Sequence, residues 1–313
     1  MNEILDKIVT VEHLAWGNTL TNKKQKFVVE LNSETVGELI KRRNQLDALH
    51  KNDLPLLMNE ILEFKKKILL DGVGLFIISG SCLKNFSAKE KISIYKLIVK
   101  ILGELIVQNI RQEKIVEIKD IGKSMKTGGR YHETKEGGSH HTDSPQWKDV
   151  PDYLSMLCIH NAKKGGTNLF LSAYTIHNKI FQERKDLLHV FYEQFHFDKR
   201  GEFKDGESPT TFEPIFEFKN KRLHFRYLRN YIDAGHGIQN KPLSQSQKDA
   251  LDYLDNLMHR EEMILSYDLK PDDMVFSDNH WVIHGRTTFE DHDDPDLKRS
   301  MLRTWIKDKT YRN

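Results

Sequence analysis

The pattern of apolar and polar positions changes part-way along the 313-residue chain. Within residues 33–68, and again within 87–106, apolar residues recur three and four positions apart, which predicts amphipathic helices. Between these regions the run GVGLFIISG (72–80) is continuously apolar and bounded by glycines, as is typical of a buried strand. We therefore expect the first third of the chain to be mainly helical, with one core strand.

Beyond about residue 115 the apolar runs become short and are interrupted by Gly, Asn, Asp and Pro, as in strands joined by turns. One later stretch, QSQKDALDYLDNLMHREE (245–262), returns to helical spacing. Helices followed by many short strands favour an α+β fold, a barrel or sandwich with helices packed around it. Because no repeat or linker divides the chain, we expect a single domain over 1–313, with helical packing at 1–70 and a strand-rich core at 71–313.

Composition limits the possible functions only modestly. The chain has 48 basic and 46 acidic residues, so it lacks the strong positive field that drives nucleic-acid binding. No apolar run reaches the roughly 18 residues of a membrane-spanning helix, and the charged N-terminal segment does not resemble a secretory signal. Cys82 and Cys158 lie far apart in apolar surroundings, as expected of reduced thiols. We expect a soluble, cytoplasmic protein with no nucleic acid or membrane as partner.

The stretch GGSHHTDSPQW (137–147) contains the first half of a candidate metal site. Alternate residues of an extended segment point the same way, so His141 and Asp143 project together, whereas His140 and Thr142 face the opposite side. One imidazole and one carboxylate supply only part of a coordination shell. By itself the triplet is a weak signal, and a polar turn is the simpler interpretation.

The C-terminal region adds a further histidine and a strand with two arginines. An apolar run ends near His284, and after an acidic turn a second run places Arg299, Arg303 and Trp305 on one face. Arginines on an otherwise apolar face are costly to bury unless an anion neutralises them. The anion is either a ligand or the acidic turn EDHDDPD (290–296) itself.

Taken together, four stretches resemble the taurine dioxygenase (TauD/TfdA)/clavaminate synthase-like family of Fe(II)- and 2-oxoglutarate-dependent dioxygenases. GVGLFIISG resembles the early core strand of the family, and the segment from HTDSPQW to GGTNLFLSA resembles its His-x-Asp strand and the glycine pair that follows. DNHWVIHGRTTFED resembles the distal-histidine strand, and RSMLRTWI the arginine strand. The likeness extends from about residue 70 to 310. It implies a double-stranded β-helix (jelly-roll) core with flanking helices.

The resemblance also implies a role for each matching residue. His141, Asp143 and His284 would bind Fe(II) as a facial triad, leaving coordination positions open for 2-oxoglutarate and O₂. Arg299 would bind the distal carboxylate of 2-oxoglutarate through its planar guanidinium.

Three further residues are expected near the co-substrate. Relatives often carry threonine where this chain has Asn168, preceded here by Thr167, so this pair is the expected second contact to 2-oxoglutarate. Arg303 either supports the first arginine or reaches 2-oxoglutarate itself.

The implied reaction is hydroxylation of an unactivated C–H bond in a small molecule, with an amino acid or amino-acid-derived metabolite as one candidate, and with release of succinate and CO₂. Asp143 fills a place where halogenating relatives have a small residue, so hydroxylation or desaturation is favoured over chlorination. Two alternatives stay open. One is a hydrolase that binds zinc or another redox-inactive metal through the same His/Asp/His set, and the other is a non-catalytic binding module on the same barrel.

Substrate contacts are harder to predict, because they lie on loops. The stretch HFRYLRNYIDAGHG (224–237) offers two arginines that either bind a substrate carboxylate or form surface ion pairs. Two aromatic residues flank the first metal-binding segment, and one arginine follows the distal histidine, where it either contacts the site or pairs with the acidic turn. The candidates are Arg226, Arg229, Tyr131, Trp147 and Arg286.

Overall fold

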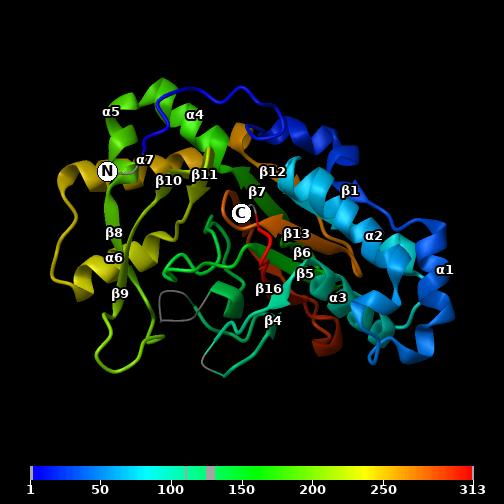
Figure 1. The fold of residues 1–313 in the computed structure, drawn as a ribbon. Coiled ribbons are helices and arrows are strands. Elements are labelled where there is room, and N and C mark those ends of the chain that lie inside the picture. Colours follow the sequence, from blue (N-terminus) through cyan, green and yellow to red (C-terminus); the bar gives the residue numbers. More distant parts are fainter. Residues whose placement is uncertain (1–2, 110, 125–130, 312–313) are drawn as a thin grey trace.

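The computed structural model describes residues 3–109, 111–124 and 131–311 and has a mixed α/β architecture built on a large sheet (Figure 1). The sheet runs in the order β1 (Val28–Val29), β2 (Leu75–Ile78), β13 (Met274–Asp278), β5 (Tyr153–His160), β16 (Ser300–Lys307) and β3 (Glu104–Leu105), and β4 (Ile115–Ile118) also pairs with β16. The pairing of β1 with β2 is parallel, and the other pairings are antiparallel. The sheet therefore places segments from both ends of the chain side by side.

A smaller sheet carries part of the site. It contains β12 (Leu265–Tyr267), β7 (Asn168–Ser172) and β14 (Val282–Arg286), in that order. The segment containing His141 joins its edge through one bridge to His284. Three further two-stranded ladders complete the β-structure: β8 (Gln194–Asp198) with β9 (Thr210–Pro214), β10 (Phe216–Lys219) with β11 (Arg222–Phe225), and β6 (Lys164–Gly165) with β15 (Phe289–Glu290).

Alternation along the strands of the large sheet produces two apolar cores. Leu75 and Ile77 of β2 contribute to a core shared with the smaller sheet, whereas Phe76 and Ile78 point into a second core on the other face. The second core is covered by α1 (Ser33–Lys41), α2 (Pro55–Phe64) and α3 (Ala88–Leu102), which gather on one side in Figure 1. The N-terminal helices thus shield the face of the sheet that lies away from the site.

The remaining helices lie on the other side of the molecule: α4 (Ala173–Glu183), α5 (Lys185–Leu188), α6 (Arg229–Ile238) and α7 (Gln245–Met258). The predicted helices within 33–68, 87–106 and 245–262 are present as α1, α2, α3 and α7, and the predicted strand at 72–80 is β2. The 1–70 region is not purely helical, because β1 joins the large sheet.

The sequence pattern did not predict α4, α5 or α6. The strand-like run TNLFLSAY ends at Ser172, whose hydroxyl accepts hydrogen bonds from the backbone N–H groups of Tyr174 and Thr175 and so begins α4. Helix α6 contains Gly235, a poor helix former, because a Cβ there would lie 2.3 Å from the carbonyl oxygen of His196 in β8. Tertiary packing therefore outweighs local propensity in both elements.

Two expectations from composition can be compared with the structure. Both cysteines are free, with Cys158 buried and Cys82 half-buried. Among the described residues, no helix combines the length and the apolar character that crossing a membrane requires.

Candidate metal and co-substrate site

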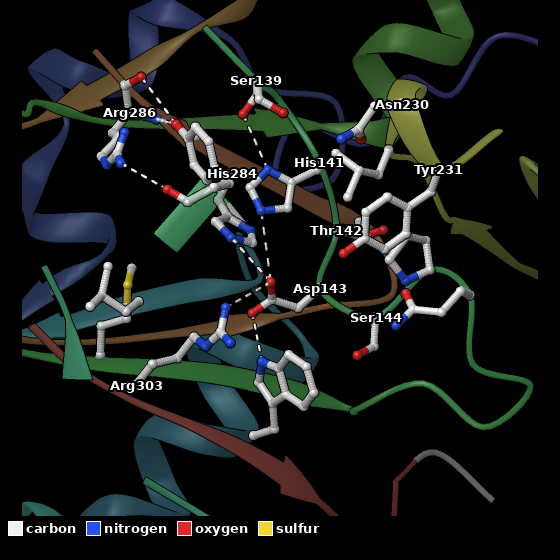
Figure 2. Close-up of a pocket in the computed structure, with 18 of the residues that line it drawn as sticks. Ser139, His141, Thr142, Asp143, Ser144, Asn230, Tyr231, His284, Arg286 and Arg303 are labelled. Carbon is white, nitrogen blue, oxygen red and sulfur yellow. Dashed lines mark hydrogen bonds and ion pairs between the residues drawn. The ribbon is translucent and has the colours of Figure 1, made fainter. Parts of the chain in front are cut away.

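Three side chains from two neighbouring segments converge in the interior (Figure 2). His141, Asp143 and His284 are all buried, and one potential ligand atom from each lies within 4.8 Å of the other two. The Asp143 Oδ1 atom is 3.7 Å from His141 Nε2 and 3.8 Å from His284 Nε2. Two imidazole nitrogens and one carboxylate oxygen on one side of a common point can hold a divalent metal ion.

Backbone pairing fixes this arrangement. His141 and His284 each donate their backbone N–H to the other's carbonyl oxygen, at 2.9 Å in both directions. His141 Nδ1 lies 3.1 Å from the Ser139 carbonyl oxygen, so this nitrogen carries the proton and Nε2 presents its lone pair toward Asp143. The sequence-based parity argument is consistent with this geometry, since His140 packs away from Asp143, against Gly285 and His259.

Burial sets the protonation states that a metal needs. Desolvation lowers the pKa of His284 to about 3 and also lowers the pKa of His141, so both rings are neutral at pH 7. Burial opposes ionisation of Asp143, but Arg303 and the two histidines outweigh it and lower the pKa of this carboxyl to about 2. Two neutral imidazoles and a carboxylate are the forms that coordinate metal ions.

Residues around the cluster hold Asp143 in one orientation. Trp305 Nε1 donates to Asp143 Oδ2 at 2.6 Å, and Arg303 Nη1 lies 3.4 Å from Oδ1. The Asn279 side chain accepts from the Asp143 backbone N–H at 2.8 Å and donates to its carbonyl oxygen at 3.0 Å. Gln108 Oε1 in turn accepts from Arg303 Nε at 2.9 Å.

Sequence reasoning did not predict roles for Trp305, Asn279 or Gln108. For Trp305 the sequence did contain a signal, because this residue shares one face of its strand with Arg303. The other two residues act across long separations in the chain and left no local pattern.

The cluster lies in a cavity of about 110 Å³ whose walls also include Arg299. Arg299 is 3% exposed, and its Nη1 has no hydrogen-bond partner among the described residues. Burial and the neighbouring Arg286 lower the pKa of Arg299 to about 10, so it remains a cation at pH 7. Asp291 accepts a hydrogen bond from the Arg299 backbone N–H and partly offsets the charge of this arginine, but no ion pair joins its guanidinium to an acid among the described residues. A buried guanidinium with an unpartnered Nη1, beside the His/Asp/His cluster, is suited to a carboxylate ligand.

Arg286 also lines the cavity, but its donors are already used. Its guanidinium donates to the backbone carbonyl oxygens of Tyr131, Thr134 and Glu136. Of the two alternatives for Arg286, pairing with Glu290 or Asp291 is not found among the described residues, and its guanidinium bonds to backbone carbonyls instead. Arg286 therefore fastens the 131–136 segment to β14.

Tyr131 and Asn168 lie at the cavity, whereas Thr167 does not. The Tyr131 ring packs edge-on against His141, with ring centres 5.1 Å apart. Asn168 is buried opposite Arg286 in the β7–β14 ladder. The Thr167 backbone N–H donates to Thr287 Oγ1 instead, so of the expected pair only Asn168 is positioned to contact a co-substrate.

Three predicted substrate contacts lie outside the cavity lining. Arg226 Nη1 donates to the carbonyl oxygens of Pro145 and Trp147, behind the cavity wall. Arg229 forms ion pairs with Asp233, Asp252 and Asp255, which corresponds to the surface alternative. Trp147 packs edge-on against Trp305, with ring centres 5.1 Å apart, and supports the wall from outside.

A mixed α/β fold that brings two histidines and one carboxylate together at a cavity is typical of non-heme iron oxygenases. The sequence pattern of the taurine catabolism dioxygenase TauD, TfdA family matches residues 53–305, and the chain belongs to this family. It is therefore an Fe(II)- and 2-oxoglutarate-dependent dioxygenase, with O₂ as second co-substrate.

Individual relatives agree with this assignment. The chain is 33% identical over 239 residues to FR-33289 synthase of Streptomyces rubellomurinus, a match that covers 75% of this chain and 69% of that protein. It is 24% identical to the taurine hydroxylase-like protein SAT17 of Stachybotrys chartarum over 51% of this chain and 41% of that one.

Solved structures share the fold at low sequence identity. Asparagine oxygenase in complex with Fe(II), a 3-hydroxyasparagine and succinate superposes with a TM-score of 0.67 at 13% identity, covering 90% of this chain and 93% of that chain. The non-heme iron oxygenase OrfP, in complex with a hydroxy-L-arginine, gives a TM-score of 0.64 at 15% identity, with the same coverage.

Proposed function

We propose that His141, Asp143 and His284 bind the Fe(II) ion and that Arg299 binds the distal carboxylate of 2-oxoglutarate. The observation that carries this proposal is the unpartnered Nη1 of Arg299 in the same cavity as the buried His/Asp/His cluster. A hydrolase that used the same metal ligands would leave this cation without a function. A 2-oxoglutarate-dependent enzyme needs both groups in one cavity.

Bound iron, together with 2-oxoglutarate and O₂, supplies the oxidising power for C–H hydroxylation. With these groups bound, one oxygen atom of O₂ would become the hydroxyl group of the product and the other would enter succinate, while the carboxylate next to the keto group of 2-oxoglutarate would leave as CO₂. Trp305 and Asn279 hold Asp143 in one orientation, and the buried walls exclude bulk water from the reacting carbon. Arg303 and Asn168 line the same cavity and are further proposed contacts to 2-oxoglutarate.

The proposed substrate is a small molecule, with an amino acid or amino-acid derivative as the leading candidate. Two neighbours of the same fold support this proposal, since they are in complex with a hydroxyasparagine and a hydroxy-L-arginine. We also propose a jelly-roll assignment for the two packed sheets, a single catalytic domain over the whole chain, and a reducing compartment such as the cytoplasm, consistent with two free cysteines.

The decisive experiment is anaerobic. Fe(II) and then 2-oxoglutarate are added to the purified protein, and the visible charge-transfer absorption of the chelated complex is recorded. We expect the band to appear in the wild type and to be lost in His284→Ala. An unchanged band in His284→Ala would remove this residue from the proposed metal site, and failure of the band to form in the wild type would contradict the proposed binding of Fe(II) and 2-oxoglutarate.

A further inference from the structure

The wall of the cavity that faces the metal-binding cluster begins immediately after Asp143. Ser144 adopts a left-handed backbone conformation with φ of 52°, which is uncommon for a residue other than glycine. Ser144 and Gln146 both line the cavity and are each only 5% exposed. Figure 2 shows Ser144 on the same side as Asn230 and Tyr231, whereas His284 and Arg303 approach Asp143 from the other side.

The contacts of Gln146 define which end of its amide faces the cavity. Gln146 Nε2 lies 3.4 Å from Glu202 Oε2, and this oxygen also accepts from Trp147 Nε1 at 3.1 Å. The reverse amide orientation would place a carbonyl oxygen against a carboxylate, which is unfavourable. Gln146 Oε1 therefore points away from Glu202, and it is buried with no hydrogen-bond partner in the described residues.

Ser144 Oγ is the second buried polar atom of this wall that no other described group satisfies. Gln146 Oε1 can only accept a hydrogen bond, and Ser144 Oγ can accept one as well as donate. Glu202 and Arg200 line the same wall and place one charge of each sign there. A buried acceptor that makes no hydrogen bond is unfavourable. This wall is therefore complementary to a ligand that brings hydrogen-bond donors.

The segment that carries these acceptors is held from behind. Arg226 Nη1 donates to the carbonyl oxygens of Pro145, at 3.1 Å, and Trp147, at 2.9 Å. Thr211 Oγ1 donates to the carbonyl oxygen of Gln146 between them. Three backbone carbonyls in succession are thus fixed before any ligand arrives, which is the rigidity that a recognition site requires.

We propose that Ser144 and Gln146 form a subsite for a nitrogen group of the substrate, so that the enzyme acts on small molecules bearing a protonated amine or a primary amide. Because Ser144 directly follows Asp143, the nitrogen is bound close to the metal, and the carbon that is oxidised lies near this nitrogen. The inference rests on the proposed function and specifies its substrate class.

The test measures binding of candidate substrates to the anaerobic Fe(II)–2-oxoglutarate complex of the protein. Binding is detected as a shift of the charge-transfer band. The probes are the proteinogenic amino acids, their carboxamides, and the matching carboxylic acids that lack the amino group. The variants are Gln146→Met, which keeps the side-chain length, and Ser144→Ala. Gln245→Met is the matched control, since this exposed glutamine of α7 also donates to a carboxylate, that of Asp249, far from the cavity.

We expect at least one nitrogen-bearing probe to shift the band, and its amine-free counterpart to bind at least about tenfold more weakly, because a lost hydrogen bond near a charge has about this effect. Gln146→Met should weaken binding of that probe about tenfold and raise its KM more than it lowers kcat, while Gln245→Met changes neither.

Three outcomes would overturn the inference: equal binding of the amine-free acids, unchanged binding in both cavity variants, or no response to any nitrogen-bearing probe although the band forms. Failure of the band itself would contradict the proposed function instead, so the two failures are distinguishable.

Discussion

The two walls of the cavity are built in different ways. The wall that carries the proposed metal ligands consists of hydrogen-bonded strands: β14 pairs with the His141 segment, and β16 brings Arg303 and Trp305 to Asp143. The opposite wall consists of the 144–146 segment, the loop at 200–202 and the start of α6, fixed mainly by side-chain contacts. The strand wall carries the groups proposed to bind the metal and 2-oxoglutarate, and the loop wall carries the groups proposed to select a substrate.

The largest effect is expected from the strand wall, in the variant His284→Ala. Removing one of three ligands should lower Fe(II) affinity by at least about 100-fold, since even changes outside the coordination shell cost 10- to 100-fold. Equilibrium dialysis against a competing chelator measures the affinity. His189→Ala is the control, because His189 is exposed. An unchanged Fe(II) affinity in His284→Ala would show that His284 is not a metal ligand.

Arg299→Ala should raise the dissociation constant of 2-oxoglutarate by roughly 10- to 150-fold, because a charge-assisted hydrogen bond contributes about 1.5–3 kcal/mol. Titration of the anaerobic charge-transfer band gives this constant directly. Arg184→Ala serves for comparison, because that arginine is exposed and paired with Asp186. If both variants bind 2-oxoglutarate like the wild type, the assignment of Arg299 is wrong.

A matched pair of tryptophans separates the two walls. Trp305→Phe keeps an aromatic ring, although a smaller one, but removes the donor to Asp143 Oδ2, so Fe(II) affinity should fall about tenfold. Trp147→Phe removes a donor to Glu202 on the loop wall, so Fe(II) affinity should stay the same. Equal losses of metal binding in the two variants would show that the walls are not independent.

The smallest effect is expected from Arg226→Met, which leaves two backbone carbonyls without their donor. The free energy of unfolding should fall by about 1 kcal/mol, measured by urea denaturation, while the charge-transfer band remains. Arg184→Met should leave stability unchanged. Loss of the band in Arg226→Met would mean that the loop wall also positions the metal ligands.

The difference between the walls explains what the sequence could predict. The four residues predicted to bind the metal and 2-oxoglutarate lie on or beside extended segments, where every second side chain points the same way. All four line one cavity: His141, Asp143, His284 and Arg299. Arg226 and Arg229 belong to a segment whose conformation depends on distant partners, namely the 145–147 carbonyls and the acids of α6 and α7. The sequence left a carboxylate site and surface ion pairs as alternatives there; the structure shows ion pairs for Arg229 and backbone carbonyl contacts for Arg226.

The same reasoning applies to the fold. Helices α1, α2, α3 and α7 have regular apolar spacing and were predicted, but α6 depends on close contact with β8 and could not be seen in the local pattern. The buried acceptors of Ser144 and Gln146 were equally hidden, because their lack of partners becomes evident only when the whole cavity is assembled.

The direct backbone pairing of His141 with His284 has a consequence for the lifetime of the protein. A metal ion held by both side chains is a reversible cross-link between two distant parts of the chain, and its binding free energy adds to the free energy of unfolding. If His141 and His284 hold the metal as proposed, the protein should open less often at this junction when Fe(II) is bound, and Fe(II) should protect it from added protease.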